Sequence, residues 1–248
     1  MKKIMLITGG SRGIGAATAR LAAADGYAVA ISYLHQPEAA AAVVDAIRAE
    51  GGKAMAVQAD VSLEADVLRL FAGVDEKLGR ITALVNNAGM LAQQMRVEQM
   101  DAARINRILA VNVTGSFLCA REAVRRMSTR HGGQGGGIVN LSSRAAQLGA
   151  PGEYVDYAAS KAAVEALTKG LALEVAVEGM RVNAVSPDLI ETDIHTSGGE
   201  PGRVARLAAG IPMQRGGQPE EVAQAILWLL SEQASFTTGS VLEVSGGR

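Results

Sequence analysis

Tyr157 and Lys161 lie four residues apart in the alanine-rich stretch "VDYAASKAAV", residues 155–164, and together they could carry a proton. Residues four apart share one face of a helix, so the phenol and the ammonium would project side by side. Alone, the phenol keeps its proton until about pH 10 and the lysine until about pH 10.4. A nearby positive charge favours the phenolate, so we expect Lys161 to lower the pKa of Tyr157 and make it a general acid and base near neutral pH. An isolated pair of this kind is more often an interfacial aromatic beside a surface charge. The rest of the sequence must therefore decide whether this pair is catalytic.

The glycine-rich stretch "TGGSRGIG", residues 8–15, comes between a short apolar run and an alanine-rich run of helical period. Strand, turn and helix in this order are what a dinucleotide site requires. Glycines let the backbone approach a pyrophosphate, and the helix N-terminus stabilises its charge. The alternative is a tight turn without a ligand. The turn residues that we predict to bind the cofactor are Gly9, Ser11, Arg12, Gly13, Ile14 and Gly15.

The choice between NADP and NAD depends on the end of the second apolar run, "ISYLHQP". An NAD site usually has an acid there, which binds both ribose hydroxyls. This chain has Tyr33 and Leu34 instead, so no carboxylate repels a 2′-phosphate, and Arg12 could pair with that phosphate. We therefore predict that NADP(H) is preferred and that NAD(H) is the alternative.

Seven short β-type runs alternate with longer stretches of helical period along the chain. This alternation predicts an α/β protein of the Rossmann-type doubly wound fold, with a seven-stranded parallel sheet and helices on both faces. We expect strands at 3–8, 28–33, 53–58, 81–86, 136–142, 180–186 and 240–246. We expect helices to begin near Gly13, Pro37, Ser62, Val97, Asn112, Tyr154 and Pro219.

The composition suits one globular domain, since 248 residues with 48% hydrophobic content can form a large core. A net charge of -1 argues against a nucleic-acid protein, and we expect the arginine run at 121–130 to be a solvated helix face. The single cysteine allows no intrachain disulfide and fits a cytoplasmic location. We expect neither a signal peptide nor a membrane span. His35, His131 and His195 lack metal-ligand spacing, so we predict surface histidines and no metal.

With these residues in view, the chain resembles the single-domain short-chain dehydrogenases/reductases, including 3-oxoacyl-acyl-carrier-protein reductase-like and glucose dehydrogenase-like members. The resemblance covers essentially the whole chain. It rests on "TGGSRGIG" at 8–15, "ADV" at 59–61, "NNAG" at 86–89, "AVNV" at 110–113, "LSS" at 141–143, "YAASK" at 157–161 and "VSP" at 185–187.

The resemblance implies a catalytic set of Asn112, Ser143, Tyr157 and Lys161. Ser143 would stabilise charge on the substrate oxygen, although Ser142 is the neighbouring candidate and the spacing to Tyr157 is one residue longer than usual. Asn112 would order a water next to Lys161. Lys161 would also bind the nicotinamide ribose. Further cofactor contacts implied by the resemblance are Asp60, Val61, Asn87, Ala88, Gly89, Pro187, Ile190 and Thr192.

The sequence departs from the family at Asp188, because Pro187-Asp188 stands where the family usually has Pro-Gly. We expect the carboxylate of Asp188 to turn outward. We expect an NADP(H)-dependent oxidoreductase that moves hydride between nicotinamide and a small carbonyl or alcohol substrate. The segment 192–215 would act as a lid, and the family implies a homotetramer, or else a homodimer. The alternatives are a non-catalytic NADP-binding regulator and an isomerase or dehydratase that uses the cofactor transiently. Arg125, Arg126 and Arg130 could dock an acyl-carrier protein.

Overall fold

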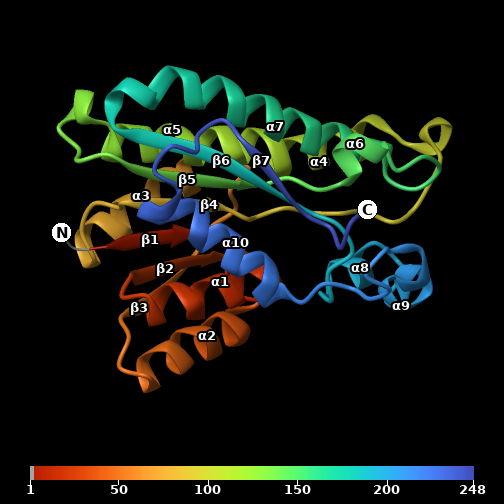
Figure 1. The fold of residues 1–248 in the computed structure, drawn as a ribbon, viewed down its shortest axis with the longest axis horizontal. Coiled ribbons are helices and arrows are strands. Elements are labelled where there is room, and N and C mark those ends of the chain that lie inside the picture. The colour runs from red at the N-terminus through yellow and green to blue at the C-terminus, as the bar shows by residue number, and fades with distance from the viewer. Residues whose placement is uncertain (1–2) are drawn as a thin grey trace.

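The fold is a parallel sheet of seven strands with helices on both faces, as the sequence predicted (Figure 1). It is seen in a computed structural model that describes residues 3–248. The strands lie in the order β3-β2-β1-β4-β5-β6-β7, and every neighbouring pair is parallel. Their bounds are β1 Ile4–Ile7, β2 Ala28–Tyr33, β3 Ala54–Gln58, β4 Ala83–Asn86, β5 Gly136–Leu141, β6 Met180–Pro187 and β7 Val241–Val244.

The central strands are apolar on both faces because helices cover the sheet from two sides. Helices α1 (Gly13–Ala24), α2 (Pro37–Ala49) and α10 (Pro219–Leu230) supply side chains to one apolar core. Helices α3 (Glu64–Lys77), α5 (Gly115–Met127) and α7 (Val155–Val175) supply the core on the other face. In Figure 1 these two groups lie on opposite sides of the strands.

The strand order reverses direction between β1 and β4, which are neighbours in the sheet although β2 and β3 separate them in sequence. The chain leaves β1 toward one side and β4 toward the other, so the two following loops diverge. Open α/β sheets bind ligands in the crevice that this divergence leaves at the carboxyl ends of the strands. The glycine-rich turn follows β1 and "NNAG" spans the end of β4, so both motifs border the crevice.

Several helices differ from the sequence prediction. The helix expected near Val97 is a single 3-10 turn, Val97–Gln99, and the α-helix that follows is α4, Ala102–Leu109. The helix expected at Asn112 begins as a π-helical turn, Ala110–Thr114, before α5. The sequence analysis did not anticipate three short helices, which are α6 (Ala145–Leu148), α8 (Ile194–Ser197) and α9 (Arg203–Leu207). Helices of four or five residues are too short to show a 3.6-residue period.

The segment 192–215 contains α8 and α9 and extends from the main body beyond the end of β6 (Figure 1). It has a small apolar cluster of its own, made by Leu189, Val204 and Ile211 with Leu207 packed against them. Across residues 3–248, no helix is both long and apolar enough to cross a membrane.

The arginines of α5 are engaged by neighbouring acids. Arg121 pairs with Glu64, while Arg125 and Arg126 pair with the buried carboxylate of Glu122. Hydrogen bonds from these arginines hold the pKa of Glu122 below its usual value, although burial works to raise it. The arginine run is therefore an ion-paired helix face, and only partly the solvated face that the sequence predicted, because the side chain of Arg126 is 16% exposed.

Candidate active site

The glycine-rich turn closely encloses the crevice between β1 and α1. Gly9 and Gly13 have φ values of +63° and +52°, which favour glycine over residues with a side chain. A Cβ atom at Gly15 would lie 2.5 Å from the carbonyl oxygen of Gly9, so this residue allows the turn and the helix to touch. Arg12 precedes the helix and its side chain caps no backbone N–H group. The first turn of α1 is thus left open to an anion.

Thr8 and Asn87 hold the turn against the loop after β4. The Thr8 hydroxyl accepts hydrogen bonds from the backbone N–H groups of Asn87 and Ala88, at 3.1 and 3.0 Å. The Asn87 side chain donates to the carbonyl oxygens of Thr8 and Gly9, at 2.9 and 2.8 Å. Sequence reasoning placed Asn87 beside the ribose and missed this bracing role, since the two residues are 79 positions apart.

A cleft runs from the glycine-rich turn to α7 and has two connected hollows, of about 480 and 160 Å³. The hollows are connected because several residues line both of them, namely Ile14, Asn87, Gly89, Leu91, Thr192 and Ile194. The sequence-predicted residues that line the larger hollow are Gly9, Ser11, Arg12, Gly13, Ile14, Tyr33, Leu34, Asp60, Val61, Asn87, Ala88, Gly89 and Thr192. The smaller hollow is lined by Ser143, Tyr157, Lys161, Pro187 and Ile190. Gly15 and Asn112 line neither hollow.

Two arginines border the larger hollow. Arg12 lies 4.0 Å from Asp193 in an exposed pair, so its guanidinium is only loosely held. Arg107, which the sequence analysis did not single out, lies 3.3 Å from a carboxylate oxygen of Asp60. Burial works to raise the pKa of Asp60, but hydrogen bonds from Ser62 and Arg107 hold it below its usual value. Asp60 is therefore an ionised acceptor at this end of the cleft.

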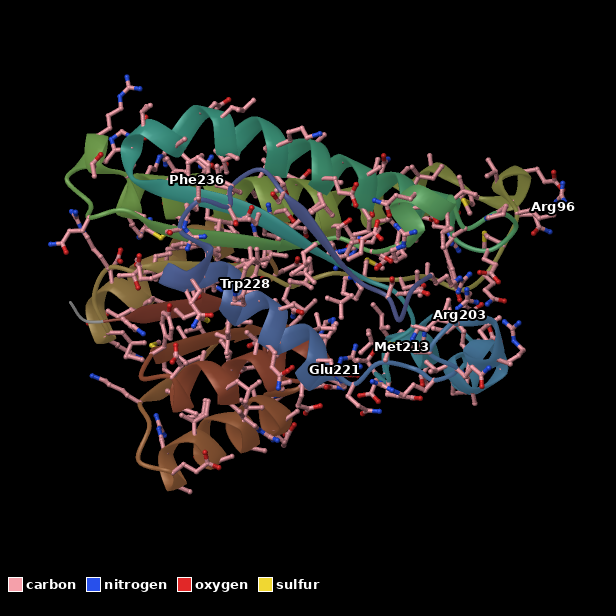
Figure 2. All side chains as sticks on the ribbon, in the orientation of Figure 1. Arg96, Arg203, Met213, Glu221, Trp228 and Phe236 are labelled. Carbon is pink, nitrogen blue, oxygen red and sulfur yellow. The ribbon has the colours of Figure 1, made fainter. Side chains whose placement is uncertain are left out.

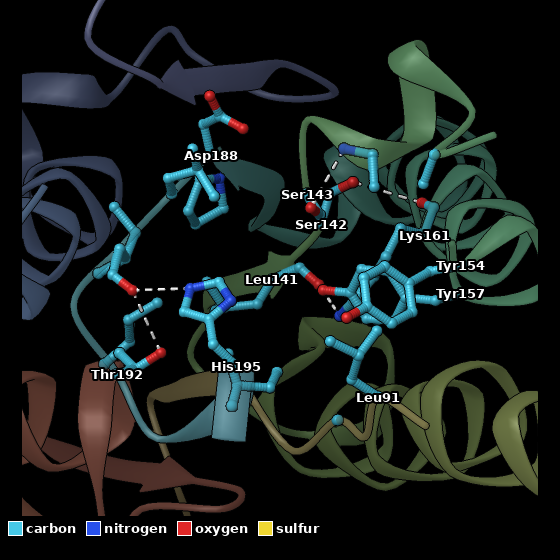
Figure 3. Close-up of a pocket in the computed structure, with 18 of the residues that line it drawn as sticks. Leu91, Leu141, Ser142, Ser143, Tyr154, Tyr157, Lys161, Asp188, Thr192 and His195 are labelled. Atoms are coloured by element: carbon cyan, nitrogen blue, oxygen red, sulfur yellow. Dashed lines mark hydrogen bonds between the residues drawn. The ribbon is translucent and has the colours of Figure 1, made fainter. Parts of the chain in front are cut away.

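The ends of β5 and α7 bring together the proposed catalytic side chains (Figure 3). Tyr157 lies in the first turn of α7, and Lys161 follows one turn later on the same face. Only 5% of Lys161 is exposed, and its ammonium donates to the carbonyl oxygen of Leu141 at 2.7 Å. The ammonium nitrogen lies 5.5 Å from the centre of the Tyr157 ring. The predicted pair therefore exists and faces the smaller hollow.

The prediction that Lys161 lowers the pKa of Tyr157 is wrong for the protein alone. Burial raises the pKa of the phenol to about 12, although a hydrogen bond with Ser143 works in the opposite direction. Burial also lowers the pKa of the Lys161 ammonium to about 8. Both groups lose water on burial, which disfavours the charged form of each, and the ammonium is directed to the Leu141 carbonyl. Sequence spacing showed the shared face but not the loss of solvent.

The two serines after β5 have different surroundings. The Ser142 hydroxyl is buried and donates to the carboxylate of Glu165 at 2.7 Å. Both serines line the smaller hollow, but it is Ser143 that hydrogen-bonds with Tyr157, while its hydroxyl oxygen accepts from the N–H group of Ala145 at 3.2 Å. This placement supports Ser143 over Ser142 as the residue that meets the substrate.

Asn112 lies in the π-helical turn and is 1% exposed. Its side chain accepts from the Met90 N–H group at 2.8 Å and donates to the Met90 carbonyl and the Ser160 hydroxyl. It thus ties the loop after β4 to α7. A Cβ atom at Gly89 would lie 3.4 Å from the Lys161 ammonium and 3.5 Å from Asn112 Oδ1, so the three residues meet. The water expected beside Lys161 stays a prediction.

The carboxylate of Asp188 points away from the centre of the smaller hollow, but it does not turn outward to solvent as expected, because its side chain is only 10% exposed (Figure 3). It is directed toward the interior rather than toward solvent, and the guanidinium of Arg248 lies 3.5 Å away. Burial raises the pKa of Asp188, while the positive charges of Arg248, Arg144 and Arg203 oppose the rise. Arg144 pairs with Glu243, so it meets a protein acid as predicted.

The smaller hollow also contains residues that the sequence analysis misjudged. His195 was predicted to be a surface residue, but α8 packs it inward and it is 8% exposed. The sequence analysis named Tyr154 only as the start of a helix, whereas the residue is 4% exposed, lines the hollow and donates to the Gly198 carbonyl at 3.1 Å. His35 and His131 are exposed, as predicted.

Comparisons with known proteins match essentially the whole chain. The family model described as enoyl-(acyl carrier protein) reductase matches residues 9–248. The uncharacterized oxidoreductase YgfF of Escherichia coli (strain K12) is 58% identical over 245 residues, 99% of each chain. A 3-oxoacyl-[acyl-carrier-protein] reductase of Synechocystis is 40% identical over 251 residues, which cover 99% of this chain and 96% of the relative. A crystal structure of 3-ketoacyl-(acyl-carrier-protein) reductase from Brucella melitensis complexed with NADH has a TM-score of 0.91 and 35% identity, with 99% and 98% of the two chains covered.

The chain therefore belongs to the short-chain dehydrogenase/reductase family. This family uses nicotinamide cofactors, and the cleft fits such a group on its own geometry. The glycine turn forms a cradle that side chains would fill, and the open N-terminus of α1 suits a pyrophosphate.

Proposed function

We propose that this protein is an NADP(H)-dependent oxidoreductase that interconverts a carbonyl compound and a secondary alcohol. The observation that carries the proposal is the continuity of the cleft. Ser143, Tyr157 and Lys161 line the same cavity system as the glycine-rich turn, so a cofactor held at the turn can extend to the proton-carrying residues. Arg12 and Tyr33 would hold the adenosine end, and Pro187 and Thr192 the nicotinamide end.

The protonation of the site favours carbonyl reduction. A phenol with a pKa of about 12 keeps its proton at neutral pH and is ready to donate it to a substrate oxygen. A reduced nicotinamide bound in the cleft would supply hydride to the carbonyl carbon. Tyr157 would donate its hydroxyl proton to the carbonyl oxygen. Ser143 would donate a hydrogen bond to the same oxygen as its negative charge develops. Lys161, with a pKa of about 8, remains an ammonium at pH 7 and would stabilise the phenolate left behind.

The test is turnover by a Tyr157→Phe variant. Protein is mixed with NADPH and a panel of ketones, and oxidation of the cofactor is followed by absorbance. We expect Tyr157→Phe to lower kcat by about 10²- to 10⁴-fold while NADPH still binds, since only the proton donor is lost. Tyr154→Phe, which removes a hydroxyl bonded to Gly198, is the matched control. Unchanged turnover in Tyr157→Phe would refute the mechanism, and cofactor binding without turnover in the wild type would favour a non-catalytic regulator.

The preference for NADP(H) is supported by Arg12, which borders the larger hollow next to Tyr33 and Leu34. The guanidinium is exposed and only weakly paired with Asp193, so it can turn to a 2′-phosphate. We expect Arg12→Gln to raise KM for NADPH by about tenfold or more and KM for NADH by about twofold or less. Equal increases for the two cofactors would defeat this assignment.

We also propose that the chain forms a homotetramer. Apolar side chains are exposed beside the last strand, where Phe236 is fully exposed and Trp228 of α10 is 41% exposed (Figure 2). Exposed apolar surface of this kind is typical of an interface between subunits. Light scattering should give four chain masses for the wild type and fewer for Phe236→Asp. A wild-type protein that stays a monomer at micromolar concentration would contradict the proposal.

We propose finally that residues 192–215 close over the substrate. Side-chain bonds join this segment to the body, from Tyr154 to Gly198, from Gln94 to Glu200 and from Arg203 to Glu153, and the Met213 N–H group donates to the Gly246 carbonyl. A segment held mainly by side-chain bonds at its surface can open at a smaller free-energy cost than a strand of the sheet. Hydrogen exchange within this segment should slow when NADPH and a substrate analogue are added together.

A further inference from the structure

The smaller hollow contains a ring nitrogen whose hydrogen-bonding capacity is unmet. His195 Nε2 lies 3.0 Å from the carbonyl oxygen of Ile190. A carbonyl oxygen can only accept, so Nε2 carries the hydrogen of this bond. The other nitrogen, Nδ1, is buried and has no hydrogen-bond partner among residues 3–248.

The ring is neutral, so Nδ1 is a bare acceptor. Burial lowers the pKa of His195, and the nearby positive charge of Arg203 acts in the same direction, against the opposing influence of the Ile190 hydrogen bond and of Glu191 and Glu200. A neutral imidazole with hydrogen on Nε2 leaves a lone pair on Nδ1. Buried polar atoms without a partner are rare in folded proteins, and one beside a candidate substrate cavity points to a ligand.

Figure 3 shows the His195 ring across the hollow from Tyr154 and Tyr157. The dashed line to the Ile190 carbonyl leaves from one side of the ring, and the second nitrogen lies on the side toward the tyrosines. Tyr154 donates its hydroxyl hydrogen to Gly198, and no donor among residues 3–248 hydrogen-bonds to Nδ1. In this arrangement a partner for Nδ1 would have to be supplied by a bound molecule.

Nδ1 is closed to water in this conformation, although the ring lines the hollow. The ring belongs to α8, a helix of four residues in the segment 192–215. A donor on a bound molecule would meet Nδ1 as this segment adjusts around it. A neutral hydroxyl fits better than an ammonium group, because the guanidinium of Arg203 lines the same hollow.

We propose that His195 selects hydroxy-carbonyl substrates, by accepting a hydrogen bond at Nδ1 from a hydroxyl group of a substrate whose carbonyl oxygen meets Tyr157. The inference rests on the proposed reductase function. A plain ketone of the same shape would leave Nδ1 buried and unpaired, and sites that are built to bind a hydroxyl discriminate strongly against such analogues. His195 is thus a specificity residue, and Tyr157 carries the proton for either class of substrate.

The test uses ketone pairs in which a terminal hydroxyl is exchanged for a methyl group of similar size. Suitable pairs are 1-hydroxypropan-2-one with butan-2-one and 4-hydroxybutan-2-one with pentan-2-one, which place the hydroxyl at two distances from the carbonyl. NADPH oxidation gives kcat/KM for each compound. We expect the wild type to prefer the hydroxy-ketone in at least one pair by about tenfold or more.

His195→Phe should remove this preference by lowering kcat/KM for the hydroxy-ketone, while the plain ketone stays within about twofold. His195→Gln, which keeps an acceptor oxygen, should retain part of the preference, and it remains informative if the Phe variant fails to fold. His131→Phe is the matched control at an exposed histidine. A wild type without hydroxyl preference in either pair overturns the inference, and so does a parallel loss for both members of a pair in the variant. A wild type that reduces no ketone would instead refute the proposed function.

Discussion

Replacing Lys161 with methionine should change how the stability of the empty protein depends on pH. Burial lowers the pKa of this ammonium to about 8 in the folded protein, against 10.5 for an ordinary lysine. Below pH 8 both the folded and the unfolded chain hold the proton, and the folded chain bears the full cost of burying the charge. Between pH 8 and 10.5 only the unfolded chain binds the proton, so raising the pH favours the folded state.

The size of this effect follows from the shift. Each pH unit in that window is worth at most 1.36 kcal/mol, and the group is only partly titrated near both ends, so the wild type should gain about 2 kcal/mol relative to Lys161→Met between pH 8 and 10. Tyr157 is present in both proteins, so its own titration largely cancels in the difference. At pH 7 the wild type bears the cost of burying the ammonium, while the variant loses the hydrogen bond that this group donates to the Leu141 carbonyl. These two effects oppose each other, so the free energies of unfolding of the two proteins differ less at pH 7 than the cost of burial alone would imply.

Urea unfolding followed by circular dichroism, at one protein concentration and at several pH values from 7 to 10, measures this difference. Lys169→Met makes the same change at an exposed position of α7 and serves as the control. Parallel stability curves for the wild type and Lys161→Met would refute the argument, because they would mean that the buried ammonium has an ordinary pKa.

Three other changes have defined outcomes. Gly15→Ala places a Cβ atom against the carbonyl of the glycine turn and should weaken NADPH binding by about tenfold or more, as measured by fluorescence titration. Ser143→Ala should lower kcat by about 10²-fold. Ser142→Ala loses the hydrogen bond to the Glu165 carboxylate, so it should lower the melting temperature and leave kcat nearly unchanged. The reverse pattern would exchange the roles of the two serines. Arg248→Gln removes the cation next to Asp188 and raises the pKa of that acid further, so ionising it costs the folded state more. The variant should therefore melt lower than the wild type at pH 7.5, and this deficit should shrink as the pH falls toward about 3.9, the pKa of an unfolded aspartate; a deficit that does not change with pH would exclude this cause.

The sheet could be predicted closely from the sequence, because seven apolar runs of strand length are separated by helical stretches. The glycine-rich turn could also be predicted from the sequence, since Gly9, Gly13 and Gly15 act locally on the turn that contains them. The pKa of Tyr157 could not be predicted in this way. Its pKa depends on how much solvent remains around the ring, and that is decided by β5, β6 and the loops that pack on α7.

His195 shows the same limit on a smaller scale. Apart from Ile194, its neighbours in sequence from Thr192 to Gly199 are polar or small and give no clear sign of burial. The side chain is buried because the four-residue helix α8 turns it toward the smaller hollow. Asn112 is the converse case, because the family motif identified the residue but not its hydrogen bonds to Met90 and Ser160, which join separate parts of the chain.

The small apolar cluster of Leu189, Val204 and Ile211 has an evolutionary consequence. It lets the segment after β6 keep its shape with little help from the main core, so mutations there can accumulate without unfolding the sheet. Random libraries confined to residues 195–211 should therefore yield many folded proteins with new substrate ranges. Libraries of equal size in β5 and α7 should yield mostly inactive ones, which would make this short segment the natural place for the lineage to diversify.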